Sequence, residues 1–223
     1  MAVRHLPAAR LLKIYRSLYA TYGPQHWWPG ETPFEVMVGA VLTQNTAWSN
    51  VEKAIANLKT LGRLRPRVIA DLPLPQLALL LKPSGYFNIK AARLRSFCVW
   101  LLQQGGVKKL ARHDTPRLRT ALLDVHGVGP ETADDILLYA CARPVFVIDA
   151  YTRRLFARLG LIAGTESYEQ LRAGFETALG PETALFNEYH ALIVHHAKHV
   201  CRPRPRCAQC CLARVCPARV VQG

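Results

Sequence analysis

Four cysteines near the end of the chain have the spacing of metal ligands. Cys201, Cys207, Cys210 and Cys216 lie within sixteen residues, with five, two and five residues between them. Thiolates this close in sequence can converge on one soft metal centre, and a set of four suits either tetrahedral zinc or an iron–sulfur cluster. Disulfides are the weaker interpretation, because seven cysteines is an odd number and no secretory signal is recognisable. Cys211 gives a less regular spacing and is left out of the expected ligand set.

Basic residues are interleaved with these cysteines and dominate the whole chain. The formal net charge is +14, with a sequence pI near 9.9. A charge imbalance of this size favours a polyanionic partner, and nucleic acid is the commonest one. A metal-pinned loop that carries guanidinium groups could hold fixed positive charge against phosphates. The arginines expected in that role are Arg202, Arg204 and Arg206.

The periodicity of apolar residues predicts an all-α fold. At 223 residues the chain can bury one good core or two small ones, and no apolar run is long enough to span a membrane. The segment 145–148 is the one extended candidate, and it is too short to imply a sheet. Helical patterns cover 11–22, 34–42, 51–61, 77–81, 91–102, 118–123, 132–140, 151–159, 168–179 and 186–200.

A glycine-framed turn joins two of these helices over residues 118–140. Gly127 and Gly129 enclose Val128, and Pro130 stands where the second helix starts. Backbone N–H groups at such a helix start can hold an anion such as a DNA phosphate. Asp149 follows the apolar run 145–148, where it could cap the next helix or act as a catalytic carboxylate.

Together, the G-V-G hairpin, the segment V-I-D-A-Y-T-R-R and the four-cysteine loop resemble the endonuclease III superfamily of DNA glycosylases. The resemblance implies a six-helix domain over 29–141 and a second helical domain, formed by 1–28 and 142–223, that carries a cluster. It implies double-stranded DNA with a damaged base as the partner, bound at the groove between the domains. It also implies a 4Fe–4S cluster on the four cysteines, although the family usually has six residues between the first two. A monomer is expected, with a cytoplasmic, nucleoid-associated location in a prokaryote.

The resemblance assigns the chemistry to Asp149. A carboxylate beside the sugar can stabilise the oxocarbenium-like transition state and activate water. Members that also cut the DNA backbone carry a lysine at the position of Glu131, where it forms a Schiff base. Glutamate cannot do this, so we expect a monofunctional glycosylase that leaves an abasic site. Lys90 and Lys198 are other lysines in plausible places, and they leave a weak lyase activity open.

Such an enzyme must flip the damaged base out of the duplex. Gln44, in the segment T-Q-N-T, matches the family position that fills the gap left by the flipped base. Tyr86 falls where the family places a wedge between bases. The other residues expected to bind DNA are Lys90, the turn Gly127, Val128 and Gly129, and the three tail arginines.

The tryptophans point to a substrate class. Trp27, Trp28 and Pro29, together with Trp48, resemble the 3-methyladenine glycosylase branch of the superfamily, whose best-known member lacks the cysteines. N-alkylated purines are cationic, and a desolvated indole face favours a cation by roughly 0.5–2 kcal/mol. We therefore expect these four residues to form a pocket for alkylated purines. The alternatives are a glycosylase for an oxidised pyrimidine or a mismatched base, and a non-catalytic DNA-binding protein that carries a cluster.

Overall fold

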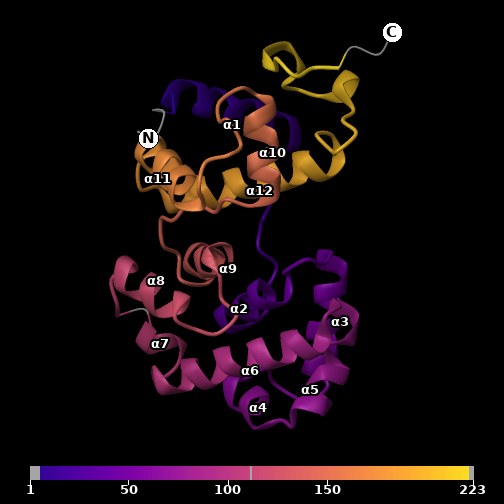
Figure 1. The fold of residues 1–223 in the computed structure, drawn as a ribbon, viewed down its shortest axis with the longest axis vertical. Helices are drawn as coiled ribbons and strands as arrows, with labels where there is room; N and C mark the ends of the chain where they lie inside the picture. The colour runs from indigo at the N-terminus through magenta and orange to yellow at the C-terminus, as the bar shows by residue number, and fades with distance from the viewer. Residues whose placement is uncertain (1–5, 111, 221–223) are drawn as a thin grey trace. The chain divides into compact units, whose positions relative to one another are not determined.

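The computed structural model describes residues 6–110 and 112–220, and within these ranges every regular element is helical (Figure 1). This confirms the expected all-α class. None of the described helices combines the length and apolarity of a membrane span. The chain divides into two compact units, which we call the central unit, residues 29–143, and the terminal unit, residues 1–28 with 144–223. The second boundary lies two residues beyond the expected one at 141.

The central unit is built around one buried helix. α2 (Pro33–Leu42) starts at the Thr32 cap, and every residue from Phe34 to Leu42 is buried. Apart from Glu35, which pairs with Lys59, the buried residues of this helix are apolar or glycine, so other helices can cover it, and it packs against α3, α6, α9 and η2. The remaining elements are α3 (Trp48–Lys59), α4 (Pro66–Asp71), α5 (Leu74–Leu80), η1 (Lys82–Ser84), α6 (Phe87–Gln103), α7 (Val107–Leu110), α8 (Thr115–Leu123), α9 (Pro130–Asp135) and η2 (Ile136–Ala140).

Two central helices were not expected, and a third differs from expectation. α4 and α7 have six and four residues, which is too short for an apolar period to be recognised. The helix expected over 132–140 is α-helical only to Asp135 and continues as a π-helical turn. The hairpin itself forms as expected, with α8, a turn at Gly127 of φ 86°, and Pro130 at the start of α9.

The terminal unit joins the two ends of the chain through aromatic packing. Its helices are α1 (Ala8–Tyr22), α10 (Ala150–Arg158), α11 (Tyr168–Leu179) and α12 (Thr183–His199), followed by the short turns η3 (Cys207–Gln209) and η4 (Ala213–Val215). Phe146 stacks on Phe175 with ring centroids 4.5 Å apart. The buried Tyr189 of α12 donates a hydrogen bond to the carbonyl of Leu11 in α1 at 2.8 Å. Val145–Ile148 are buried without forming a strand.

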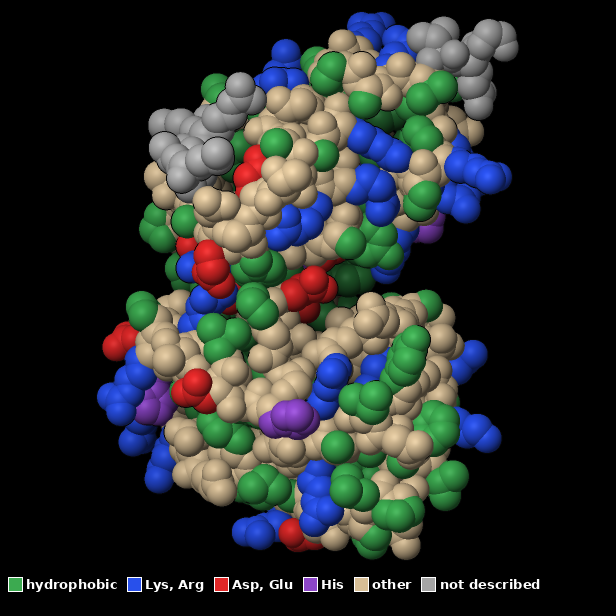
Figure 2. All heavy atoms as spheres, viewed as in Figure 1, with side chains coloured by type: hydrophobic (Ala, Val, Ile, Leu, Met, Phe, Trp, Pro, Cys, Tyr) green, Lys and Arg blue, Asp and Glu red, His purple; other side chains and the backbone are tan. Residues whose placement is uncertain are grey.

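Positive charge is spread over the surface of both units. Lys and Arg side chains are more frequent than Asp and Glu side chains on the visible face (Figure 2). This distribution agrees with the net charge of +14. Neither unit concentrates its basic residues on this face into one continuous patch.

Candidate active site and cysteine loop

Asp149 is the first residue of the candidate active site, and it stands at the N-cap of α10. Its Oδ1 accepts a hydrogen bond of 2.7 Å from the backbone N–H of Thr152. Its Oδ2 lies 3.5 Å from Nε2 of His190, which comes from α12. Both side chains belong to residues that are at most 9% exposed. The structure therefore holds one carboxylate in a fixed orientation between two helices of the terminal unit.

The surroundings of Asp149 keep it ionised. Burial alone would raise the pKa of this carboxyl group. The imidazole of His190 at 3.5 Å, together with the Thr152 N–H, outweighs burial and holds the pKa below its ordinary value. A buried carboxylate that remains charged can stabilise positive charge that develops on a neighbouring atom. Asp149 can therefore cap α10 and also act as a catalytic carboxylate.

Lys198 lies near the same carboxylate, about two turns after His190 on α12. Its Nζ is 5.7 Å from the ring centroid of Trp27 and 5.8 Å from that of Tyr151. Burial lowers the pKa of this amine, while the charge of Asp149 acts in the opposite direction. The terminal unit therefore brings a carboxylate, an amine and two aromatic faces together.

Lys90 corrects one of the expected DNA contacts. This residue is 2% exposed, and its Nζ donates to the carbonyls of Leu42 at 2.9 Å and Ser84 at 2.7 Å. Burial, with the nearby charge of Arg93, lowers its pKa to about 8. The prediction that Lys90 binds DNA is therefore wrong. Its ammonium satisfies carbonyls at the end of α2 and in η1, which have no partner within their own helices.

Gln44 is held against the hairpin turn of the central unit. Its Nε2 donates to the carbonyl of Gly127 at 3.1 Å and to Oγ1 of Thr132 at 3.0 Å. Its Oε1 accepts a hydrogen bond from Arg93. A Cβ added at Gly127 would collide with the side chain of Arg93. Arg93 therefore joins the T-Q-N-T turn to the hairpin, and sequence reasoning missed it because it is one arginine among many.

Tyr86 and Glu131 are both at the surface. Tyr86 caps α6 in the left-handed conformation, with φ 45°, and is 70% exposed. Ile89, one turn later and 53% exposed, is a second apolar side chain at this position that the sequence analysis did not single out. Glu131 is exposed in the first turn of α9.

The four expected pocket residues fall into two pairs. Trp27 and Trp28 belong to the terminal unit, with ring centroids 5.9 Å apart. Pro29 and Trp48 line one hollow of roughly 460 Å³ in the central unit. Glutamates missed by the sequence analysis also line it, namely Glu31, Glu35 and Glu52. The indole N–H of Trp48 donates to Oε1 of Glu52 at 2.9 Å, and the i,i+4 spacing of this pair was the signal that could have revealed it.

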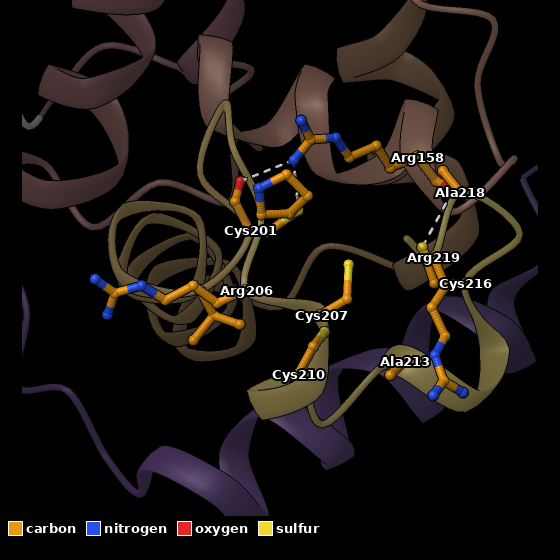
Figure 3. A pocket seen from close by; sticks show the side chains of 11 residues that line it. Arg158, Cys201, Arg206, Cys207, Cys210, Ala213, Cys216, Ala218 and Arg219 are labelled. Carbon is orange, nitrogen blue, oxygen red and sulfur yellow. Dashed lines mark hydrogen bonds between the residues drawn. The ribbon is translucent and has the colours of Figure 1, made fainter. Parts of the chain in front are cut away.

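The four expected ligand cysteines line one cavity of the terminal unit, and their side chains surround a common space in Figure 3. Polar groups lie close to three of the sulfurs, and two of these groups are N–H donors. Arg158 lies 3.3 Å from the sulfur of Cys201, the Val220 N–H lies 3.4 Å from that of Cys207, and His196 Nε2 lies 3.5 Å from that of Cys210. Such donors suit thiolate sulfurs that carry negative charge.

The chemistry of this cavity fits a soft metal centre. Its donors are four thiols, whereas Cys211 is exposed and does not line it. Within the described ranges, no three possible ligands are already gathered at the spacing of a bound metal ion. Arg206 lines the cavity, and Arg202 and Arg204 are exposed beside it. Arg158 donates to the carbonyls of Arg202 and Pro203 and so fixes the first part of the loop.

These features define a helix-hairpin-helix protein with a buried carboxylate and a cysteine loop. Residues 38–181 match the model of the HhH-GPD superfamily of base excision DNA repair proteins. The chain belongs to this superfamily, which confirms the resemblance drawn from the sequence.

Individual relatives agree with this assignment. A protein of Methanocaldococcus jannaschii named as a DNA repair glycosylase is 44% identical over 92% of this chain and 95% of its own. A similar solved structure is that of MagIII, a 3-methyladenine DNA glycosylase of Helicobacter pylori, bound to 1,N6-ethenoadenine. Its sequence is 33% identical, its TM-score is 0.75, and the match covers 86% of this chain and 98% of that one. Endonuclease III in a non-covalent DNA complex shares the fold, with a TM-score of 0.81 at 20% identity over 96% of each chain. The protein is thus a DNA repair glycosylase.

Proposed function

We propose that this protein hydrolyses the N-glycosidic bond of an alkylated purine in double-stranded DNA and leaves an abasic site. The observation that carries the proposal is the state of Asp149, which is buried, oriented by Thr152 and His190, and held ionised. As the purine leaves, positive charge builds on the sugar, and a fixed carboxylate stabilises it. Because Asp149 is ionised, it can also accept a proton from the attacking water.

Removal of the base proceeds by water in this proposal. The hairpin position at which bifunctional members carry a lysine holds Glu131, which has no amine. Base release therefore needs no covalent intermediate with the hairpin. The side chains available for positioning the DNA around the flipped base are Gln44 in the T-Q-N-T turn and Tyr86 at the start of α6.

The preference for an alkylated purine rests on aromatic and acidic groups. Trp48 lines a hollow with three glutamates and Lys59, which pairs with Glu31 and Glu35, so that Glu52 is the carboxylate held beside the indole. A cationic base is favoured both by an indole face and by nearby carboxylates. The likeness to MagIII, at 33% identity, supports the same class of substrate.

A 4Fe–4S cluster is the metal centre that we propose for the cysteine loop. Cys201, Cys207, Cys210 and Cys216 would hold it, since they face one cavity. When bound, such a cluster supplies a rigid cross-link and one-electron redox chemistry. The arginines of the loop, held by Arg158, would then present fixed positive charge to DNA phosphates.

The test compares the protein with its Asp149→Asn variant on methylated duplex DNA, and it identifies the free bases. Asparagine caps a helix about as well as aspartate, so loss of activity in this variant reports chemistry rather than folding. We expect the variant to bind DNA normally and to release 3-methyladenine at least about 100-fold more slowly. Glu131→Gln serves as the control, with base release retained.

Other outcomes lead to defined conclusions. Release of an oxidised pyrimidine or a mismatched base in place of alkylated purines would overturn the substrate class and keep the glycosylase. Tight DNA binding with no release from any damaged duplex would instead favour a non-catalytic DNA-binding protein. Equal base release by both forms would remove Asp149 from the mechanism.

A further inference from the structure

We propose that Lys198 is an amine that condenses with the abasic sugar, so that the protein also acts on abasic DNA. The inference rests on the proposed function in one respect, which is the place of the sugar beside Asp149. Lys198 comes from α12, the helix that also supplies His190 to that carboxylate. Lys198 is an exposed residue whose amine is partly desolvated, so a DNA strand can still approach it.

Two aromatic rings hold the amine in this place. The Nζ of Lys198 faces the ring of Trp27 at 5.7 Å and the ring of Tyr151 at 5.8 Å. Tyr151 is two residues beyond Asp149, in the first turn of α10. The rings and the carboxylate thus come from two segments of the terminal unit, the one that carries Trp27 and the start of α10, and Lys198 comes from a third. An amine held in place loses less freedom on reaction than one that swings freely in solvent.

The remaining lysines are poorly suited to this role. The chain has eight, and only Lys13 and Lys198 belong to the terminal unit, which contains Asp149. Lys90 is buried and donates to two carbonyls. Lys59 forms ion pairs of 2.9 Å with Glu31 and Glu35. Lys13 is also exposed, but it lies on α1, whereas Lys198 is the lysine on which the charge of Asp149 acts.

The reaction balances without any further reagent. The lone pair of Nζ attacks C1′ of the open-chain aldehyde, a C–N bond forms, and the carbonyl oxygen leaves as water. Transfer of a C2′ proton to water then allows the C3′–O bond to break, and the phosphate departs with the bonding electrons. Hydrolysis of the imine releases the unsaturated sugar and restores the amine.

Burial favours the reactive form of the Lys198 amine, whereas the two ring faces favour the ammonium. Burial disfavours the ammonium, and the pKa of Lys198 is lowered, although the charge of Asp149 opposes this shift. The groups that interact with the amine are Asp149, Tyr151 and Trp27, together with His195 of the same helix. A lower pKa means that more free amine is present near neutral pH, and it is this form that attacks the aldehyde.

The test uses a duplex with one preformed abasic site and sodium borohydride, which reduces the imine to a stable protein–DNA bond. We expect the unmodified protein to form a covalent adduct, and Lys198→Arg to reduce its yield at least about tenfold. Arginine keeps the positive charge over the two rings but does not condense as a primary amine. Lys13→Arg is the matched control, because it changes the other lysine of the same unit, and it keeps the yield unchanged.

Peptide mapping of the adduct in the unmodified protein provides a result that depends on no variant. Attachment at Lys198 supports the proposal, whereas attachment at any other residue, or no adduct at all, overturns it. Because the abasic site is preformed, the experiment does not depend on base release. A protein that is trapped through Lys198 but releases no base would retain this inference and lose the proposed function. The reverse result would leave the glycosylase and remove the inference.

Discussion

The carboxylate of Asp149 and the imidazole of His190 lie 3.5 Å apart, although the two residues are 41 positions apart in the chain. Asp149 begins α10 and His190 lies within α12, and these helices pack directly against each other. The buried pair explains how a carboxylate that burial alone would neutralise stays ionised. It also makes His190 a positioning residue whose contribution can be measured.

Replacing His190 by glutamine should change the pH dependence of base release. In the native protein the pKa of Asp149 lies below its ordinary value, so activity should persist to pH values below the usual titration range of an aspartate. Without the imidazole, only Thr152 and Lys198 remain to oppose the effect of burial. The pKa of Asp149 therefore rises, and the carboxylate accepts a proton at higher pH. The acid limb of the kcat/KM profile should therefore move to higher pH.

The control for this experiment is His199→Gln, at an exposed position on the same helix. It should leave the acid limb in place. An acid limb that stays unchanged in His190→Gln would show that His190 does not set the charge state of Asp149.

Gly127→Ala should destabilise the hairpin and weaken DNA binding. The residue has φ 86°, and a Cβ there would displace the side chain of Arg93, which holds Gln44. We expect a loss of about 1–2 kcal/mol in the free energy of unfolding, from backbone strain alone. Gly129→Ala is the comparison, since Gly129 has φ −95° and open space at its Cβ, and it should cost less than about 1 kcal/mol. Equal losses in denaturant unfolding would contradict this explanation.

Asp134→Asn should be among the most destabilising changes in the central unit. Asp134 is completely buried in α9, and its Oδ1 accepts from Nε of Arg119 in α8 at 2.7 Å. Removing the charge leaves the guanidinium without its carboxylate in a mostly buried place, which costs about 3–5 kcal/mol. Asp71→Asn removes an exposed pair with Arg67 and should cost at most about 1 kcal/mol. Urea unfolding of both variants distinguishes the two environments.

Glu52→Gln should reduce the preference for cationic bases. Glutamine can still accept the hydrogen bond from Trp48, so the indole stays oriented while one charge at the hollow is removed. We expect kcat/KM for a cationic purine to fall about fivefold relative to that for neutral hypoxanthine. Asp71→Asn controls for the loss of one exposed carboxylate elsewhere. If both substrates lose activity equally, Glu52 orients Trp48 and has no part in charge recognition.

Cys207→Ser should prevent assembly of the cluster. The native protein should be brown and should contain about four iron atoms, while the variant should lose the visible absorbance and part of its affinity for DNA. Cys211→Ser is the matched control, because this exposed cysteine does not line the cavity, and it should keep its iron. Metal analysis that finds zinc, or no metal, in the native protein would overturn the proposed cluster.

Much of the site could be predicted from local sequence. The cysteine spacing, the glycine-framed turn and the aspartate after an apolar run are each local patterns, because their chemistry needs close neighbours in the chain. Helix positions followed in the same way from the apolar period, whereas α4 and α7 are too short to show one. The break after Asp135 was missed because a π-helical turn leaves no signature in apolar spacing.

The tertiary structure decided which polar groups meet. Lys90 and Lys198 were equivalent candidates in the sequence, yet packing buries the first against two carbonyls and places the second over Trp27 and Tyr151. The sequence by itself thus determined the class of protein, and it identified Asp149 as the hypothetical catalytic carboxylate. Partners distant in the chain, such as His190 for Asp149, were decided only by the fold, because helix packing sets their distance and burial sets their charge.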